Sequence, residues 1–224
     1  MGRMSPKTKP RAPGRPRAGD APLSVDEMLK AALGAFATHG YDGMSVSALS
    51  RDLGVSHNLL HQRFGSKEGL WYAAVDWGFG GLADELAKAA DPTLSDPLDQ
   101  LAVILRRFLE VSAEHPELVG LMNIEGRERS ARLTFLYDHY VEPLTAPIGR
   151  LLEHLAAAGR VRPISARAFL FLVAHGAAAP FTLTALAREL DPSDPFDPAE
   201  QAAYVDAVVD VLIAGIRLTP GAPG

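Results

Sequence analysis

The side chains best suited to chemistry lie in a polar stretch at residues 57–63, which has the sequence HNLLHQR. In a helix, Asn58 and Gln62 would share one face, because they are four residues apart. Each amide can form two hydrogen bonds with an adenine edge in the major groove of DNA, and Leu59 could pack on a thymine methyl group. Arg63 would pair with a phosphate group, which adds affinity without sequence preference. This stretch therefore indicates contact with double-stranded DNA.

Two histidines of this stretch, His57 and His61, are also four residues apart, which is the spacing of a helical metal pair. No glutamate and no third ligand stand beside them, so we expect no metal there. The chain has no cysteine, which excludes disulfides, thiolate metal sites and cysteine nucleophiles. We therefore expect neither a metal nor another cofactor.

Two short helices separated by a glycine turn must position these side chains. Ser45 is a candidate N-cap, and the apolar residues Val46, Leu49 and Leu53 follow it on one helical stripe. Gly54 should end this first helix, because glycine readily adopts the positive φ of a sharp C-terminal turn. The polar stretch then begins the second helix.

The second helix has Ser56 as its candidate N-cap and carries Leu60 and Phe64 on its inner edge. This layout is that of a helix-turn-helix, in which the second helix enters the major groove. A preceding helix at residues 24–39 begins with a capping box, SVDE, and ends at Gly40. The three helices should share one small core, centred on Phe36, Leu49, Leu53, Leu60 and Phe64.

A longer pattern surrounds these helices. Residues 31–56, AALGAFATHGYDGMSVSALSRDLGVS, followed by FGSKEGL at residues 64–70, resemble the N-terminal DNA-binding domain of TetR-family transcriptional regulators. The resemblance covers about residues 24–70. It implies a non-enzymatic homodimer that binds a palindromic operator, usually as a repressor released by a small-molecule ligand. It also implies an all-helical C-terminal domain that holds both the ligand cavity and the dimer interface.

The resemblance assigns roles to single positions. Ser45 and Lys67 match phosphate contacts, and His61 stands where the family most often has a tyrosine. Leu59 also departs from the pattern, because that site is often small or hydroxylic, so an operator sequence cannot be borrowed from relatives. The full set of expected DNA contacts in the folded domain is Ser45, Ser56, His57, Asn58, Leu59, His61, Gln62, Arg63 and Lys67.

Residues 1–22 form a basic segment with six Lys/Arg and one acidic residue, which we expect to be disordered. Its PGRPR run at residues 13–17 resembles an AT-hook core, in which Arg15 and Arg17 would lie in a narrow minor groove. The alternative is a solubilising tail.

Charge is divided unevenly along the chain, whose formal net charge is −5. Residues 1–70 carry ten Lys/Arg and six Asp/Glu, a net charge of +4. The remaining residues carry twelve and twenty-one, a net charge of −9. A basic head on an acidic body indicates that only the head meets a polyanion.

The body, residues 68–218, should consist of long helices, which makes the chain an all-α protein with a helix-turn-helix domain at residues 23–67 and a flexible tail at 219–224. We expect a kinked helix at residues 130–158, because Pro143 and Pro147 interrupt it, and a strongly apolar helix at residues 160–188, bent at Pro180. The small residues 176–179 suggest a dimer seam, and the last two long helices of two subunits would form a four-helix bundle. Candidate walls of a ligand cavity are Trp77, Phe108, Met122, Phe135, Tyr140 and His175.

Ordinary core packing is the alternative role for Trp77 and for His175.

Two other classes of function are alternatives to a DNA-binding regulator. An all-helical enzyme or metal protein would use His139 and Glu142, but no matching pair occurs on another helix. A sequence-tolerant architectural DNA binder would rely on the basic arm. No apolar run approaches the roughly 20 residues that span a bilayer, so we expect a cytoplasmic protein, associated with the nucleoid when bound to DNA.

Overall fold

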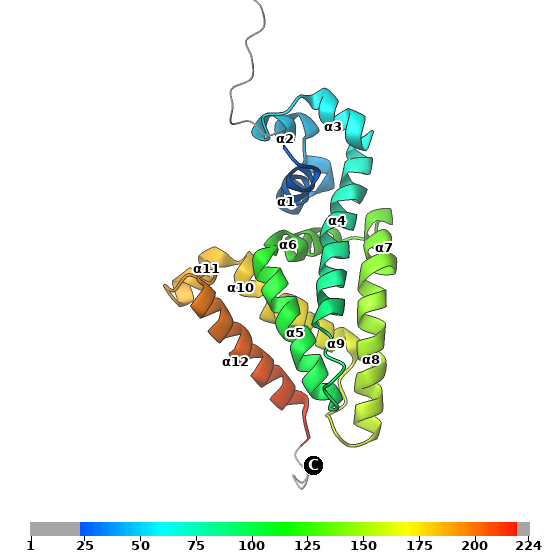
Figure 1. Cartoon of the computed structure of the whole chain (residues 1–224), viewed down its shortest axis with the longest axis vertical. Helices are drawn as coiled ribbons and strands as arrows, with labels where there is room; N and C mark the ends of the chain where they lie inside the picture. Colours follow the sequence, from blue (N-terminus) through cyan, green and yellow to red (C-terminus); the bar gives the residue numbers. More distant parts are fainter. Residues whose placement is uncertain (1–22, 219–224) are drawn as a thin grey trace, which may run out of the picture.

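The computed structural model describes residues 23–218 as a helical protein without a strand, which confirms the all-α prediction (Figure 1). Arg15, Arg17 and the predicted tail lie outside the described residues. The elements are α1 (Val25–Gly43), α2 (Val46–Asp52), α3 (His57–Phe64), α4 (Lys67–Ala89), α5 (Pro97–Glu114), α6 (Pro116–Glu125), α7 (Ala131–Leu136), η1 (Tyr137–Val141), α8 (Glu142–Ala157), α9 (Ala166–Phe171), η2 (Leu172–Ala177), α10 (Ala179–Thr182), α11 (Thr184–Leu190) and α12 (Pro198–Ile216); η1 and η2 are π-helical turns.

The first three helices begin and end where local signals predict. Ser24 caps α1 in a complete capping box, since its hydroxyl accepts from the Glu27 N–H at 3.1 Å and the Glu27 carboxylate accepts from the Ser24 N–H at 2.8 Å. Gly40 interrupts the helical course of α1 with a φ of 68°. Gly54, with a φ of 65°, makes the turn after α2. The predicted helix-turn-helix is therefore confirmed as a local structure.

Helix α4 joins this small domain to the body, running down from α3 alongside α5 (Figure 1). Its 23 residues span roughly 34 Å at about 1.5 Å per residue. The predicted domain boundary falls at its first residue, but the apolar core does not stop there. Phe36, Leu49 and Leu60 are buried in the same cluster as Leu118 of α6 and Leu136 of α7. The two domains thus share one continuous core.

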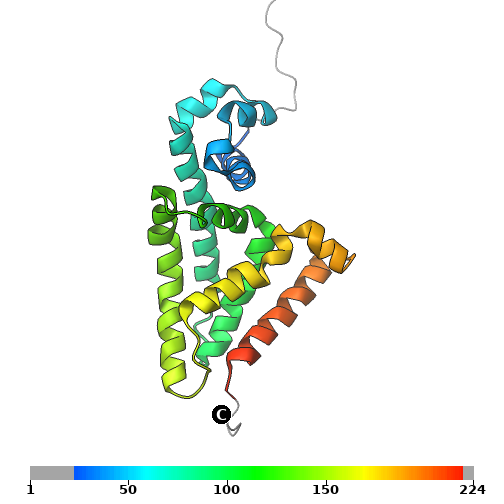
Figure 2. The ribbon, with the colours of Figure 1, turned by 180° about the vertical axis from the view of Figure 1, so that it is seen from behind.

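A second core lies between α5, α8, α9 and α12, which meet in the lower part of the body (Figure 2). Its centre includes Leu109, Leu152, Phe169, Phe181 and Val209, all buried. Asp96 is the N-cap of helix α5, and Pro97 occupies its first position. None of the described helices combines the length and apolarity that crossing a membrane requires.

The helix predicted at residues 130–158 is interrupted, as expected, near Pro143. Proline cannot donate a backbone hydrogen bond, so the chain forms the π-helical turn η1 immediately before it. The Glu142 N–H then bonds to the carbonyl of Tyr137, five residues back. This turn widens the helix just where Tyr140 faces the interior.

The prediction of one long helix at residues 160–188 is wrong. Residues 160–165 are not helical, because Pro163 disfavours a helix at the residue before it and Val161 forms an antiparallel bridge with Arg217. A hydroxyl cap at Ser165 starts α9, and η2, α10 and α11 follow as separate short elements. Pro180 lies in the first turn of α10.

The dimer seam predicted at residues 176–179 needs correction at two of its four residues. Ala177 and Ala178 are buried within this chain, in the core that includes α12. The hydroxyl of Tyr204 donates to the carbonyl of Ala177 at 2.6 Å. Ala177 and Ala178 therefore pack inside one subunit and do not face a partner, whereas Gly176 is exposed and Ala179 is partly exposed.

Candidate nucleic-acid interface and cavity

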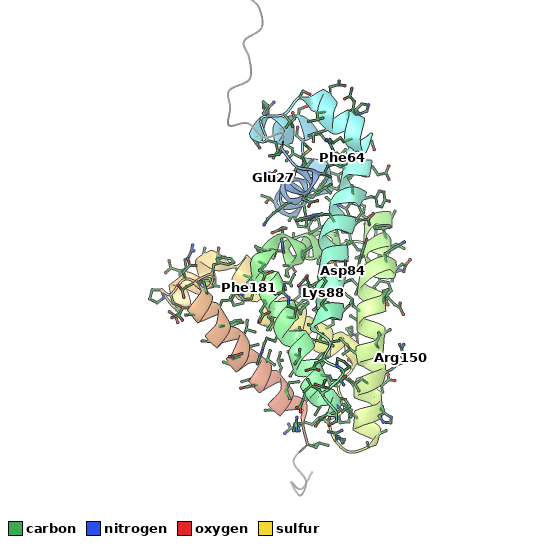
Figure 3. All side chains as sticks on the ribbon, viewed as in Figure 1. Glu27, Phe64, Asp84, Lys88, Arg150 and Phe181 are labelled. Atoms are coloured by element: carbon green, nitrogen blue, oxygen red, sulfur yellow. The ribbon has the colours of Figure 1, made fainter. Side chains whose placement is uncertain are left out.

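The outer face of α3 is polar and exposed. His57, Asn58, His61, Gln62 and Arg63 are all exposed, while Leu60 on the opposite edge is only 2% exposed. This helix lies at the far end of the molecule from α12 (Figure 1). Figure 3 shows its last residue, Phe64, beside the start of α4. The structure thus gathers the predicted base-contacting side chains on one accessible surface.

The two candidate cap residues lie where phosphate contacts are expected. Ser45 accepts from the Ala48 N–H at 3.3 Å, and Ser56 accepts from the Leu59 N–H at 3.1 Å. Both serines are exposed. A hydroxyl at a helix N-terminus can also donate to an anion there, where the unpaired backbone N–H groups favour negative charge.

Leu59 differs from its predicted setting. Its side chain is half-buried and packs against the core that α1 to α4 share. Only part of it remains available to a thymine methyl group, since burial against the core competes with contact to DNA. This position is therefore partly structural.

Lys67 stands in a set of contacts that the sequence did not reveal. Its ammonium donates to the Asp42 carbonyl at 3.2 Å and lies 4.9 Å from the centroid of the Tyr41 ring. The guanidinium carbon of Arg132, on α7, lies 4.1 Å from the same centroid. Partial burial, followed by the nearby Glu68 charge, raises the pKa of Tyr41. Tyr41 thus connects the body to the predicted phosphate anchor through two cation–π contacts.

Arg132 is itself held by a buried acid. Its Nε donates to both carboxylate oxygens of Glu125, at 3.0 and 3.1 Å, and the Glu125 side chain is only 3% exposed. A charge buried so deeply requires a partner of opposite sign. The pair fixes α7 to the end of α6. No sequence signal predicted it, because the two residues are seven apart and lie on either side of a bend.

A cavity of about 140 Å³ lies in the body between α4, α5, α6, α8 and α9. Four of the six side chains predicted to line a cavity do so, namely Phe108, Met122, Tyr140 and His175. Sequence reasoning missed further apolar walls, including Phe79, Leu82, Leu86, Leu144 and Phe169. The spacing of Phe79, Leu82 and Leu86 on α4, three and four residues apart, was the signal that could have identified them.

The other two predicted cavity residues, Trp77 and Phe135, lie outside the cavity. Trp77 points to another side of α4, where its ring meets His115 edge-on at 5.8 Å. Phe135 belongs to an aromatic cluster, stacked on His139 at 4.2 Å and edge-on to Tyr72 at 4.7 Å. Helical periodicity identified both as apolar, but it did not distinguish the several faces of a helix that is packed all round.

Metal ligands do not gather anywhere in residues 23–218, where no group of three His, Asp or Glu side chains is suitably placed. His139 is engaged with its own helix, since its Nδ1 lies 3.0 Å from the Phe135 carbonyl.

An apolar stripe remains exposed on α12, opposite the residues that it buries. Val205 and Val209 face the core, whereas Val211 is 72% exposed. The exposed small residues Ala203, Ala207 and Ala214 continue the line of Val211. Further exposed apolar side chains precede this helix, at Phe171, Leu172, Leu183, Leu186 and Leu190. Large apolar side chains exposed in this number are typical of an interaction site.

Comparison with known proteins finds relatives for both parts of the chain. The family model for bacterial regulatory proteins of the tetR family matches residues 28–74. The model described as tetracyclin repressor-like, C-terminal domain, matches residues 97–212. The HTH-type transcriptional regulator BetI of Rhizobium meliloti (strain 1021) is 31% identical over 105 residues, 47% of this chain. Those residues make up 51% of BetI, so the chain spans about half the length of this curated relative.

Solved structures share the whole fold at low identity. The fatty acid degradation regulator FadR of Bacillus halodurans has a TM-score of 0.61 and 18% identity, covering 87% of this chain and 100% of its own. The ketosteroid transcriptional regulator KstR2 of Mycobacterium tuberculosis has a TM-score of 0.62 and 16% identity, covering 90% and 99%. At these identities the likeness concerns the fold alone.

Proposed function

Because the chain belongs to the TetR family of transcriptional regulators, we propose that it is a homodimeric repressor that a small molecule releases from a palindromic operator. The observation that carries the proposal is the exposed polar face of α3 on a module whose core continues into a body with an apolar cavity. Family members are generally non-enzymatic, and we infer the same of this chain. It would act in the cytoplasm, where its operator lies.

DNA contact would come from the outer face of α3 and from the anchors around it. We assign base contacts to Asn58 and Gln62, and phosphate contacts to Ser45, Arg63 and Lys67. His57 and His61 are exposed beside them, and Ser56 lies at the N-terminus of the same helix. The basic arm with Arg15 and Arg17 would add minor-groove contacts.

Release would depend on α4 and α6. Leu82 and Leu86 of α4 line the cavity, and the same helix begins at Lys67, directly after α3. Met122 of α6 also lines the cavity. The same helix packs on α1 at Gly120, where an added Cβ would lie 3.4 Å from the Cβ of Ala37. A ligand that favours another arrangement of these helices would change the separation of the two recognition helices from about 34–36 Å.

Dimerisation would use the exposed apolar stripe of α12 together with exposed residues of the segment before it. Two copies of such a surface can pack as a bundle around a twofold axis. Phe171 and Leu172 would contribute from α9 and η2, since both are exposed whereas Ala177 and Ala178 are buried.

Substitution on α3 and α4 separates sequence readout from phosphate affinity. Gln62→Ala should change the preferred operator sequence, with a loss of roughly 1–3 kcal/mol at the base pair that Gln62 contacts. Lys67→Ala should weaken binding to all DNA sequences alike and reduce the slope of log affinity against log salt by about one. Selection of bound sequences from a random pool, followed by gel shifts at several salt concentrations, measures both effects.

Lys88→Ala is the matched control, since it also removes one positive charge from α4 but from the part of the helix within the body (Figure 3). Lys88 is exposed and pairs with Glu85. It should leave both readouts unchanged. A parent protein that selects no sequence from the pool would rule out operator recognition. An unchanged preference and affinity in Gln62→Ala would show that α3 enters the groove in another orientation.

A further inference from the structure

The wall of the cavity is uniform in one respect. Among the described residues that line it, none is Asp, Glu, Lys or Arg, and most are aliphatic or aromatic. Only four lining side chains carry a polar atom, namely Ser112, Tyr140, Thr145 and His175. The hydrogen bonds of these four groups therefore decide which polar group of a ligand the cavity can accept.

Two of the hydroxyl groups donate their only proton to the backbone. Ser112 donates to the carbonyl of Phe108 at 2.7 Å, and Thr145 donates to the carbonyl of Val141 at 2.7 Å. A hydroxyl has one proton but two lone pairs. Each oxygen can therefore still accept a hydrogen bond from a ligand, but it has no second proton to donate.

The third hydroxyl follows the same rule. Tyr140 donates to a carboxylate oxygen of Asp76 at 2.6 Å. Burial first, and then this hydrogen bond, raise the pKa of Tyr140 far above its ordinary value, so the phenol keeps its proton. The charge next to this part of the wall is the negative one of Asp76, which opposes the approach of an anion.

The fourth group is a neutral imidazole. Burial lowers the pKa of His175, which keeps the ring uncharged at neutral pH. Its Nδ1 lies 2.8 Å from Oδ1 of Asn123, an acceptor, so Nδ1 carries the proton and Nε2 has the free lone pair. All four polar side chains thus offer acceptors, and none offers a free proton or a positive charge.

We propose that the effector is an uncharged, largely apolar molecule whose polar group donates a hydrogen bond, that is, an aliphatic alcohol or a phenol. The inference rests on the proposed function, in which this cavity is the effector site. A carboxylate would lose its hydration without gaining a cation or a donor. A ketone or ester could bring only an acceptor to a wall of acceptors, whereas a hydroxyl would bring the missing proton.

A set of three probes with the same ten-carbon skeleton tests this inference on the full-length chain. Isothermal titration should give 1-decanol an affinity about fivefold above that of 2-decanone, which reflects one net hydrogen bond. Decanoate should bind at least about tenfold more weakly than 1-decanol, because its charge is desolvated. Equal or tighter binding of 2-decanone or decanoate would overturn the proposal, as would the absence of binding by all three.

Variants locate the acceptor. Ser112→Ala, Tyr140→Phe, Thr145→Val and His175→Leu each remove one, and at least one of them should abolish the preference for 1-decanol over 2-decanone. Thr134→Val is the matched control, since Thr134 also donates to a carbonyl four residues back, at 3.1 Å, but is exposed outside the cavity. If all four variants kept the parent's preference, the hydroxyl would not be recognised by this wall.

The outcome is independent of the test for operator binding. Selection of DNA sequences by the ligand-free protein examines the proposed function alone. If decanoate bound most tightly while a defined operator was selected, only the ligand class would be wrong. If 1-decanol bound as expected but no operator was selected, the proposed ligand class would be supported and the proposed regulatory function would be wrong.

Discussion

Replacing Arg132 with methionine is expected to lower the free energy of unfolding by about 3 kcal/mol, because the Glu125 carboxylate would be left buried without its partner. Glu125 is 5% exposed as a whole residue. Both of its carboxylate oxygens accept a hydrogen bond from the same Arg132 nitrogen, Nε. The estimate lies at the low end for a broken buried pair, since the Arg132 side chain is itself 28% exposed. Urea unfolding followed by circular dichroism measures the loss.

Two further variants identify the cause. Adding Glu125→Met to Arg132→Met should restore most of the stability, because an apolar pair can replace a buried ion pair at little cost. Arg107→Met is the matched control. Arg107 bonds to three acids, Glu85, Glu110 and Glu114, but all three are more than a third exposed, so its loss should cost about 1 kcal/mol or less. Equal losses for Arg107→Met and Arg132→Met would show that burial of Glu125 does not matter.

The same substitution should affect DNA binding. Arg132 lies against the Tyr41 ring, which Lys67 also contacts, so its loss frees the turn after Gly40 from the body. We expect Arg132→Met to weaken operator binding in protein that is still folded, at a temperature well below its midpoint of unfolding. Unaltered affinity under those conditions would assign Arg132 a role in stability alone.

The helix-turn-helix could be predicted from the sequence because its signals are local. A serine cap and an apolar stripe define each short helix, and Gly54 supplies the turn between them. The exposed positions of Asn58 and Gln62 follow from the burial of Leu60, since each lies two residues from Leu60 and therefore on the opposite face of α3. Four cavity residues could be named for a similar reason, because large apolar side chains on facing helices must meet inside the body.

The errors arose where distant segments decide the structure. Residues 160–188 have the composition of one apolar helix, but Val161 pairs with Arg217, which lies 56 residues later in the chain, at the end of α12. Trp77 and Phe135 are apolar and helical, yet each lies in a cluster of its own beside the cavity. The contacts of Arg132 with Glu125 and Tyr41 join three helices. None of these pairings leaves a trace in the spacing of residues along the chain.

Gly78→Val should also be strongly destabilising, by roughly 3 kcal/mol, because α4 has no room for a side chain where it crosses α1 and α6. A Cβ at Gly78 would lie 2.6 Å from Leu33 Cδ2 and 2.9 Å from Leu118 Cδ2. Leu33 is fully buried and Leu118 is 4% exposed, so neither side chain can move aside freely. Gly81→Val, one turn further along the same helix, is the matched control, because a Cβ there meets no atom within 4 Å.

Denaturant unfolding of Gly78→Val and Gly81→Val also tests how the small domain packs against the body. The contacts of Gly78 come from α1 of the small domain and from α6 of the body, so its close packing helps to join the two domains in one continuous core. In Gly78→Val, a separation of α4 from α1 should also displace α3, and operator affinity should fall together with stability. If Gly78→Val were as stable as Gly81→Val, α4 would have to lie further from both helices, and a ligand shifting α4 would no longer have a packed path to α3.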